Sequence, residues 1–154
     1  MASRPSERLR SLGIVLPEAP VPAGSYAPVV QVGKEAWVSG QIVREHGAIL
    51  HPGLVGRDVT PEMARDLARR ATLQALSALH AALGSIDRID RFVRVTVYVA
   101  SAPGFDRQHE VANGATDLLV ELFGEAGRPA RSAIGVAGLP LSAPVEVDFV
   151  ASTP

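Results

Sequence analysis

Two charged side chains toward the C-terminal end of the chain offer the clearest prospect of chemistry. Arg131 follows Pro129 and Ala130 at the start of an expected strand, and Glu146 lies in the last expected strand. A guanidinium holds a carboxylate through two parallel hydrogen bonds and does not titrate at physiological pH. A carboxylate on an adjacent strand can order or activate a water molecule. The pair indicates either a site for a small anion or a plain cross-strand salt bridge, and spacing alone favours the salt bridge.

The strands that would position these residues follow from alternation of apolar and polar side chains. In residues 145–150, Glu146 and Asp148 alternate with Val145, Val147 and Phe149. In residues 92–99, four valines alternate with Phe92, Arg94, Thr96 and Tyr98. Shorter strands are expected at residues 31–32, 36–38, 48–50 and 132–136.

Two helices are expected between these strands. The first has Thr60 as N-cap and Pro61 at its first position, carries small and apolar residues at spacings of three and four, and ends at Gly84. The second runs from about residue 105 to residue 123. We expect one domain over residues 1–154, in which residues 1–19 form an extended N-terminal lead-in.

The resulting order, β-β-(β)-α-β-α-β-β, predicts an α+β fold in which both helices cover one face of the sheet. The other face would carry a mixed row of side chains: Phe92, Arg94, Thr96, Tyr98, Glu146 and Asp148. Aromatic residues are scarce in this chain, so we expect a second copy to cover them. A small closed ring with sites at the seams between subunits satisfies this requirement.

Composition excludes several classes of protein. The 154 residues contain 15 basic and 16 acidic side chains, so the net charge of −1 provides no general attraction for nucleic acid or anionic membranes. The absence of Cys excludes thiol nucleophiles, Zn–thiolate centres and disulfides, and it fits a cytoplasmic protein. No run of about 20 apolar residues is present, and the N-terminus lacks the pattern of a secretory signal.

Motifs for nucleotides, metals and activated serines are absent from the sequence. Its four histidines, His46, His51, His80 and His109, lack the spacing of a metal site, and we assign them no role. We therefore expect neither a metal nor a cofactor.

Five short segments occur in order along the chain and together resemble one family. They are Gly24-Ser25-Tyr26, Val38-Ser39-Gly40-Gln41-Ile42, Gly84-Ser85-Ile86-Asp87, Pro129-Ala130-Arg131-Ser132-Ala133 and Val145-Glu146-Val147. This combination is similar to the reactive-intermediate deaminase superfamily, also called Rid or YjgF-like, and spans about residues 20–151. Residues 112–119 and 123–127 are similar to a subgroup with a longer second helix.

The resemblance implies a chorismate-mutase-like fold, in which three subunits form a barrel with clefts between them. It also implies hydrolysis of reactive enamines and imines, such as 2-aminoacrylate, to 2-keto acids and ammonia without a cofactor. The implied ligand is a small carboxylate-bearing molecule. Two other functions stay open: a non-catalytic sensor of small carboxylates or keto acids, and, ranked lower, a ribonuclease or a chorismate mutase.

By position in these segments, Arg131 matches the arginine that binds the substrate carboxylate, and Glu146 matches the glutamate that positions the attacking water. Tyr26 and Ser39 match pocket-lining residues, with the tyrosine reaching across the seam, and Asn113 matches an asparagine on the second helix. The chain departs from the family pattern at Ala133, where a Cys is usual, and at Gly135, where a Glu is usual. Backbone groups at Ala133 can still bind substrate, whereas Gly135 leaves room for a larger ligand.

Overall fold

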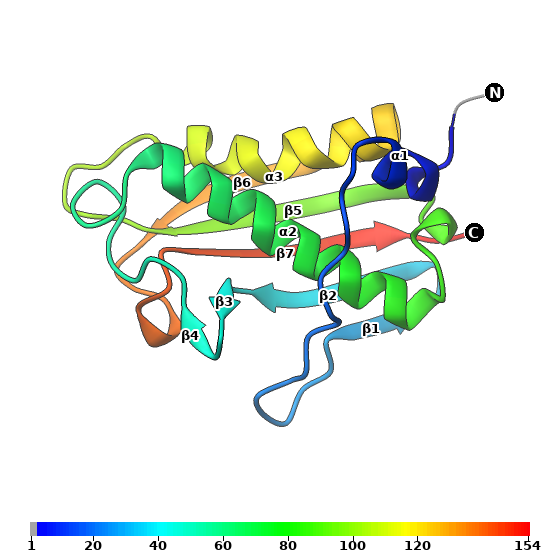
Figure 1. Ribbon diagram of the computed structural model, residues 1–154, viewed down its shortest axis with the longest axis horizontal. Coiled ribbons are helices and arrows are strands. Elements are labelled where there is room, and N and C mark those ends of the chain that lie inside the picture. The colour runs from blue at the N-terminus through cyan, green and yellow to red at the C-terminus, as the bar shows by residue number, and fades with distance from the viewer. Residues whose placement is uncertain (1–2) are drawn as a thin grey trace.

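A computed structural model describes residues 3–154 and shows a five-stranded sheet with two long helices packed on one face (Figure 1). The strands are β1 (Val29–Val32), β2 (Glu35–Gln41), β7 (Val145–Ser152), β5 (Arg91–Ala100) and β6 (Ala130–Val136), in that spatial order. Neighbouring strands are antiparallel except β5 and β6, which are parallel. The expected α+β architecture is confirmed.

The two long helices form where the apolar spacing predicts them. Helix α2 (Pro61–Leu83) begins after Thr60, whose side chain accepts a hydrogen bond from the Met63 N–H, and ends at Gly84 with a left-handed φ of 82°. Helix α3 (Gln108–Phe123) starts three residues later than expected and buries the predicted apolar face against α2 and the sheet. Short 3₁₀ turns follow at η1 (Ile86–Arg88), η2 (Gly124–Gly127) and η3 (Pro140–Ser142).

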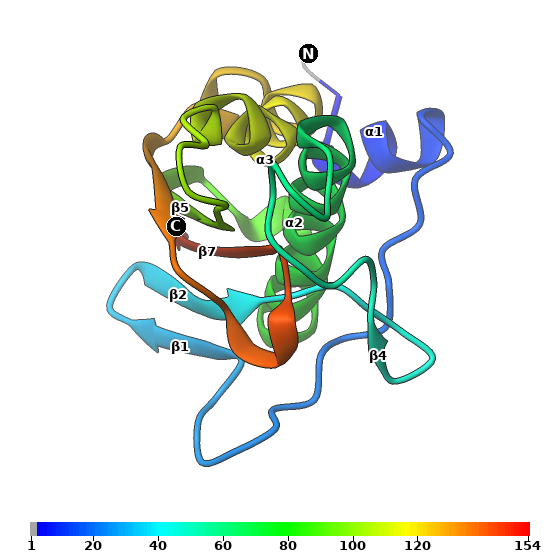
Figure 2. The ribbon, with the colours of Figure 1, turned by 90° about the vertical axis from the view of Figure 1, so that its left-hand side faces the viewer.

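The strand predicted at residues 48–50 is present, but it belongs to a separate two-stranded sheet. Strand β4 (Ala48–Ile49) pairs with β3 (Arg44–Glu45) and takes no part in the main sheet. Figure 2 shows β4 set apart from the five strands. The turn between β3 and β4 uses His46 and Gly47, both with positive φ.

Phe92 lies on the side of the sheet that the helices cover. The prediction that it lies on the opposite, open face is therefore wrong. The pairing of β5 with β7 shifts register between Phe92 and Arg94, which inserts an extra residue and interrupts the strict alternation. Phe92 is fully buried and packs edge-on against Phe123 and Phe149, with ring centroids 4.9 and 5.1 Å apart. Val93 is 40% exposed instead.

Residues 1–19 were expected to be extended, and this is wrong for the segment that forms helix α1 (Pro5–Ser11). Pro5 occupies the first turn, and the Glu7 carboxylate accepts a hydrogen bond from the Arg4 N–H at 3.0 Å. Leu9 is buried, and Ser6 donates to Asp87. After α1 the chain crosses α2, where Ser77 donates to the Pro17 carbonyl, before it enters β1 (Figure 1).

The face of the sheet opposite the helices holds both large apolar and polar side chains. Val30 and Trp37 are 50% and 52% exposed there, and Ile134 is 41% exposed. In the middle of this face, the Tyr98 hydroxyl donates to Asp148 at 3.0 Å. Within residues 3–154, no helix combines the length and apolarity needed to cross a membrane.

Candidate functional site

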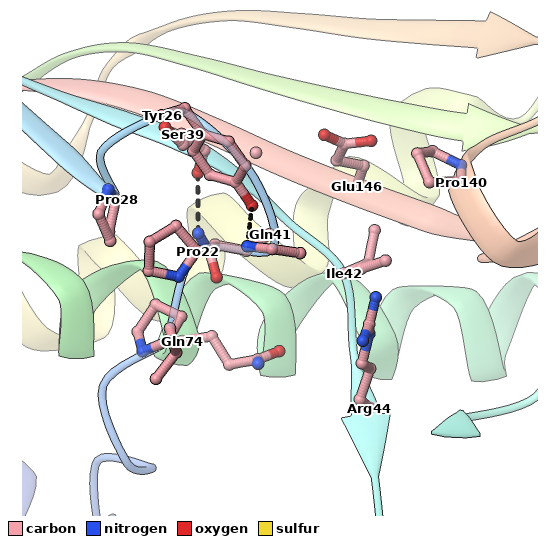
Figure 3. A pocket seen from close by; sticks show the side chains of 14 residues that line it. Pro22, Tyr26, Pro28, Ser39, Gln41, Ile42, Arg44, Gln74, Pro140 and Glu146 are labelled. Atoms are coloured by element: carbon pink, nitrogen blue, oxygen red, sulfur yellow. Dashed lines mark hydrogen bonds between the residues drawn. The ribbon is translucent and has the colours of Figure 1, made fainter. Parts of the chain in front are cut away.

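A pocket of about 590 Å³ opens beside β2 and β7, beneath the segment that leads into β1. Its floor includes Gln74 of α2, and Glu146 of β7 forms part of its wall (Figure 3). The volume is within the range of small-molecule sites. Its lining residues are Pro20, Val21, Pro22, Ala23, Tyr26, Pro28, Ser39, Gly40, Gln41, Ile42, Arg44, Gln74, Pro140 and Glu146.

The Glu146 side chain lies against Gly40, at the irregular pairing of β2 with β7. A Cβ atom on Gly40 would overlap the Glu146 carboxylate, so this position must lack a side chain for the carboxylate to stay where it is. Burial raises the pKa of Glu146, and the nearby charge of Asp148 raises it further. The Glu146 carboxylate accepts no hydrogen bond from residues 3–154, so it is free to meet a ligand or water.

Asp148, two residues further on the same face of β7, is a second half-buried acid. Burial raises its pKa and outweighs the opposing effect of the hydrogen bond from Tyr98. Tyr98 is the pairing partner of Glu146 on β5, and burial raises the pKa of its hydroxyl. The alternation in 145–150 placed Asp148 correctly on the open face but gave it no role.

Tyr26 and Ser39 line the same pocket as Glu146. The Ser39 hydroxyl donates to the Ala27 carbonyl at 2.6 Å, which ties β2 to the segment that carries Tyr26. The Tyr26 hydroxyl accepts from the Ala23 N–H at 3.3 Å, and 54% of the residue is exposed. Figure 3 shows both side chains on the same side of the pocket. Three of the sequence-predicted site residues are thus brought together.

Arg131 lies elsewhere, on the edge strand β6 beside α3. Its Nη1 donates to Asn113 Oδ1 at 2.7 Å and to Thr116 Oγ1 at 3.1 Å. Both partners are neutral, and Arg131 forms no ion pair with any residue from 3 to 154, so the guanidinium is held in place while its charge stays available. Ala133, two residues along the strand, is partly buried against the core.

Within a single chain, the sheet edge that carries Arg131 (the Arg131 edge) does not meet the pocket that contains Glu146 (the Glu146 pocket). Strand β5 lies between β6 and β7, so the expectation that Glu146 stands on the strand adjacent to Arg131 is wrong. Arg131 is level with Val95 and contacts α3, whereas Glu146 pairs with Tyr98 and faces away from the helices. Because the two side chains point to opposite faces of the sheet, no cross-strand salt bridge joins them.

Comparisons with known proteins show the family of this chain. Residues 6–152 match the family described as "YjgF/chorismate mutase-like, putative endoribonuclease". The chain belongs to the YjgF family. It is 43% identical over 148 residues to protein TCP17 of Trypanosoma cruzi, covering 96% of this chain and 92% of that protein. It is 31% identical to a 2-iminobutanoate/2-iminopropanoate deaminase of Dermatophagoides farinae, covering 89% and 92%.

A solved structure extends the match to three dimensions. A "putative endoribonuclease" from Shewanella oneidensis superposes with a TM-score of 0.92 at 33% identity, covering 97% of this chain and 99% of the other. The YjgF fold expected from the five short segments is therefore confirmed.

No cluster of three or more His, Cys, Asp or Glu suited to a metal ion occurs within residues 3–154. His46 and His51 both have a positive φ. None of the four histidines lines the pocket beside Glu146.

Two residues that line the pocket of this YjgF-family chain, Gln74 and Arg44, were not predicted from the sequence. Gln74 Oε1 is buried without a hydrogen-bond partner among residues 3–154. Gln74 stands three residues after Ala71 and four before Ala78, so a polar residue on the apolar stripe of α2 was a detectable signal. Arg44 gave no such signal, because its approach to the pocket depends on the path of the chain after β2.

Proposed function

We propose that this protein hydrolyses reactive enamine and imine intermediates, of the 2-aminoacrylate type, to 2-keto acids and ammonia without a cofactor. The observation that carries the proposal is the Glu146 carboxyl: it is half-buried, has a raised pKa and faces a pocket with the Tyr26 and Ser39 hydroxyl-bearing residues. A group that titrates closer to neutrality is suited to both accept and donate a proton. The 31% identical relative named as an imine deaminase supports this proposal.

The chemistry consumes one water molecule and returns every proton that it uses. A proton added to the enamine carbon gives the iminium, C=NH2+. Water attacks the iminium carbon while the Glu146 carboxylate takes a proton from it, which gives a neutral tetrahedral carbinolamine. Glu146 gives that proton to the nitrogen, the C–N bond breaks and ammonia leaves. The hydroxyl group then passes its proton back to the Glu146 carboxylate as the C=O bond forms, and this proton replaces the one added to carbon. Holding the reactants in place contributes about 7–11 kcal/mol at best, and proton transfer adds about 10²–10⁴-fold.

We propose that the working site forms between two copies of the chain, in a homotrimer. Arg131 and Glu146 point to opposite faces of one sheet, so they can act on one small molecule only if they come from different subunits. The open face supplies apolar surface for such an association through Val30, Trp37 and Ile134.

Within this site, Arg131 binds the substrate carboxylate. Its Nη1 is held by Asn113 and Thr116, which leaves the Nε–Nη2 side without a partner among residues 3–154 and free for bidentate binding. Asn113, expected to bind substrate, is assigned the role of orienting Arg131. The backbone of Ala133 remains a candidate for contact with the substrate.

The test is hydrolysis of 2-aminoacrylate generated in situ, measured above the rate of an enzyme-free control. We expect Glu146→Gln to lose about 10²–10⁴-fold in rate and Arg131→Ala to lose at least about 10²-fold. Arg128→Ala is the matched control, because Arg128 is exposed and pairs only with Glu125 among residues 3–154. Wild-type rates in both site variants would overturn the proposal.

A non-catalytic binder of small carboxylates is the second candidate, favoured by Ala133 and Gly135, where this chain departs from the pattern of the deaminases. The Gln108 amide nitrogen lies 2.8 Å from where a Cβ on Gly135 would stand, so Gln108 occupies the space that was expected to admit a larger ligand, and that expectation is wrong. Calorimetry with 2-oxobutanoate separates the two functions. Binding without hydrolysis of any imine favours the binder.

A further inference from the structure

We propose that Arg44 and Gln74 select imino and keto acids with a second anionic group at the far end, that is, molecules of the 2-iminodicarboxylate class. This inference rests on the proposed function, and it assigns a substrate class to the pocket beside Glu146. It concerns residues outside the five segments that mark the family.

The pocket is larger than a three-carbon substrate needs. Its volume of about 590 Å³ is roughly twenty times the ~30 Å³ that one water molecule occupies in the liquid. In the single chain, a molecule such as 2-aminoacrylate, with six non-hydrogen atoms, would leave most of it empty. The subunit that brings Arg131 to the proposed site takes up part of this space. The walls beyond Glu146 include Pro22, Pro28, Ile42 and Pro140, so the middle of a longer ligand would meet apolar surface.

Arg44 is the one cationic residue among the fourteen that line the pocket. It forms no ion pair or side-chain hydrogen bond with residues 3–154. Its neighbour Glu45 does not neutralise it, because Glu45 accepts from Arg70 Nη1 at 2.7 Å, and Arg70 also binds Asp66. Figure 3 shows the Arg44 side chain rising from β3 beside Ile42, on the same side of the pocket as Glu146.

Glu146 does not pair with Arg44 either. No Arg44–Glu146 contact falls within salt-bridge distance among residues 3–154, and the Glu146 carboxylate rests against Gly40 instead. In the proposed site the carboxylate next to the imine is bound by Arg131 of another subunit. A substrate with one carboxylate therefore leaves the Arg44 charge unmatched, whereas a distal carboxylate matches it.

Gln74 provides the second polar contact. Its Oε1 is buried without a partner among residues 3–154, so no hydrogen bond to this oxygen opposes rotation of the amide. Figure 3 shows the Gln74 amide extending from α2 toward the side of the pocket where Arg44 lies. A side-chain amide offers two N–H donors as well as its oxygen, so rotation about its last bond lets it donate to a carboxylate bound by Arg44.

The experiment compares three imino acids produced in situ by an amino-acid oxidase. They are 2-iminobutanoate, 2-iminoglutarate and the neutral amide that corresponds to 2-iminoglutarate. For the wild-type protein we expect kcat/KM to be about tenfold or more higher for 2-iminoglutarate than for the other two. In Arg44→Gln this preference should vanish, with the larger loss of kcat/KM on 2-iminoglutarate, and Arg44→Lys should retain part of the preference.

Arg10→Gln serves as the control, since Arg10 is exposed on α1 and does not line the pocket. Equal rates for the charged and neutral long substrates, or a preference that survives Arg44→Gln, would overturn the inference and leave the proposed function intact. If no imine is hydrolysed, the proposed function fails. Calorimetry with 2-oxoglutarate and 2-oxobutanoate then decides the inference, which requires tighter binding of 2-oxoglutarate that Arg44→Gln abolishes.

Discussion

The Glu146 pocket and the Arg131 edge hold their charged groups in opposite ways. The Glu146 carboxylate is half-buried, rests against Gly40 and accepts no hydrogen bond from residues 3–154, so its surroundings disfavour its charge. Arg131 is exposed, and two neutral side chains of α3 fix its position without neutralising it. Burial thus raises the pKa of the acid, whereas hydrogen bonds from the guanidinium to neutral side chains fix only the orientation of the cation. A substrate that needs both must be bound where these two environments meet.

The largest expected effect comes from dividing the two regions between chains. Arg131→Ala and Glu146→Gln should each be nearly inactive as pure proteins, but co-refolded mixtures should regain activity, because some seams pair an intact Arg131 with an intact Glu146. Random assembly at equal amounts predicts about a quarter of the wild-type rate. The double variant mixed with either single variant is the control and should regain nothing. Failure of the single-variant mixture to recover, despite proven co-assembly, would show that one chain supplies the whole site.

Disturbing only the Glu146 region should have the next largest effect. In Gly40→Ala, the new methyl group displaces the carboxylate, and a misplacement of about 1 Å lowers the rate by about 10²-fold. The Glu146 side chain can move, so the melting temperature should change little. Gly138→Ala is the matched control, because a Cβ there has no atom within 4 Å. Full activity in Gly40→Ala would mean that the position of the carboxylate is unimportant.

Disturbing only the Arg131 region should have a smaller effect. Asn113→Ala removes one hydrogen bond from a guanidinium that keeps its bond to Thr116, so we expect about a tenfold loss in kcat/KM. The loss should appear mainly as a higher KM, because the carboxylate of the bound substrate is affected. Asn113→Asp, which still accepts the bond but pairs with the cation, should also weaken substrate binding. A change confined to kcat would argue for direct participation of Asn113 in the reaction.

The smallest expected effect is on stability. Burial, followed by the charge of Asp148, raises the pKa of Glu146 above its value of 4.5 in the unfolded chain. The folded state therefore binds more protons between the two pKa values, and the free energy of unfolding falls as pH rises through this window and stays lowered above it. Glu146→Gln should raise Tm by on the order of a few °C near pH 8 and by nothing near pH 4.

The exposed Glu18 provides the control for this measurement, and Glu18→Gln should leave Tm unchanged at both pH values. A Tm gain for Glu146→Gln that is equally large near pH 4 would show that packing, and not ionisation, is responsible.

The layers of the fold could be predicted from the sequence, but the positions of Arg131 and Glu146 relative to each other could not. Period-two and period-3.6 patterns report which face of an element is buried, so both helices and the alternation in β7 were predictable. They carry no information on strand order. The parallel crossover through α3 places β5 between β6 and β7, so the two residues are not on adjacent strands. The registers of β6 and β7 with β5 then place them on opposite faces, Arg131 level with Val95 and Glu146 with Tyr98.

Local irregularities were the other source of error. The extra residue at Phe92–Arg94 places the Phe92 side chain on the opposite face from the one that strict alternation predicts. No residue type in this segment indicates the irregularity in advance. Helix α1 is short, and its stability depends on the contacts of Ser6 and Leu9 with residues distant in the sequence. Tertiary contacts of this kind outweigh local preference.

The fluorescence of Trp37 reports whether another molecule covers the face of the sheet opposite the helices. Trp37 is the single tryptophan of the chain, it is 52% exposed beside Val30, and its indole N–H donates to Glu35 at 3.1 Å. When another molecule settles on that face, the indole leaves water, and its intrinsic fluorescence emission moves to shorter wavelength. Dilution and recombination can therefore be followed on the unlabelled protein through one chromophore.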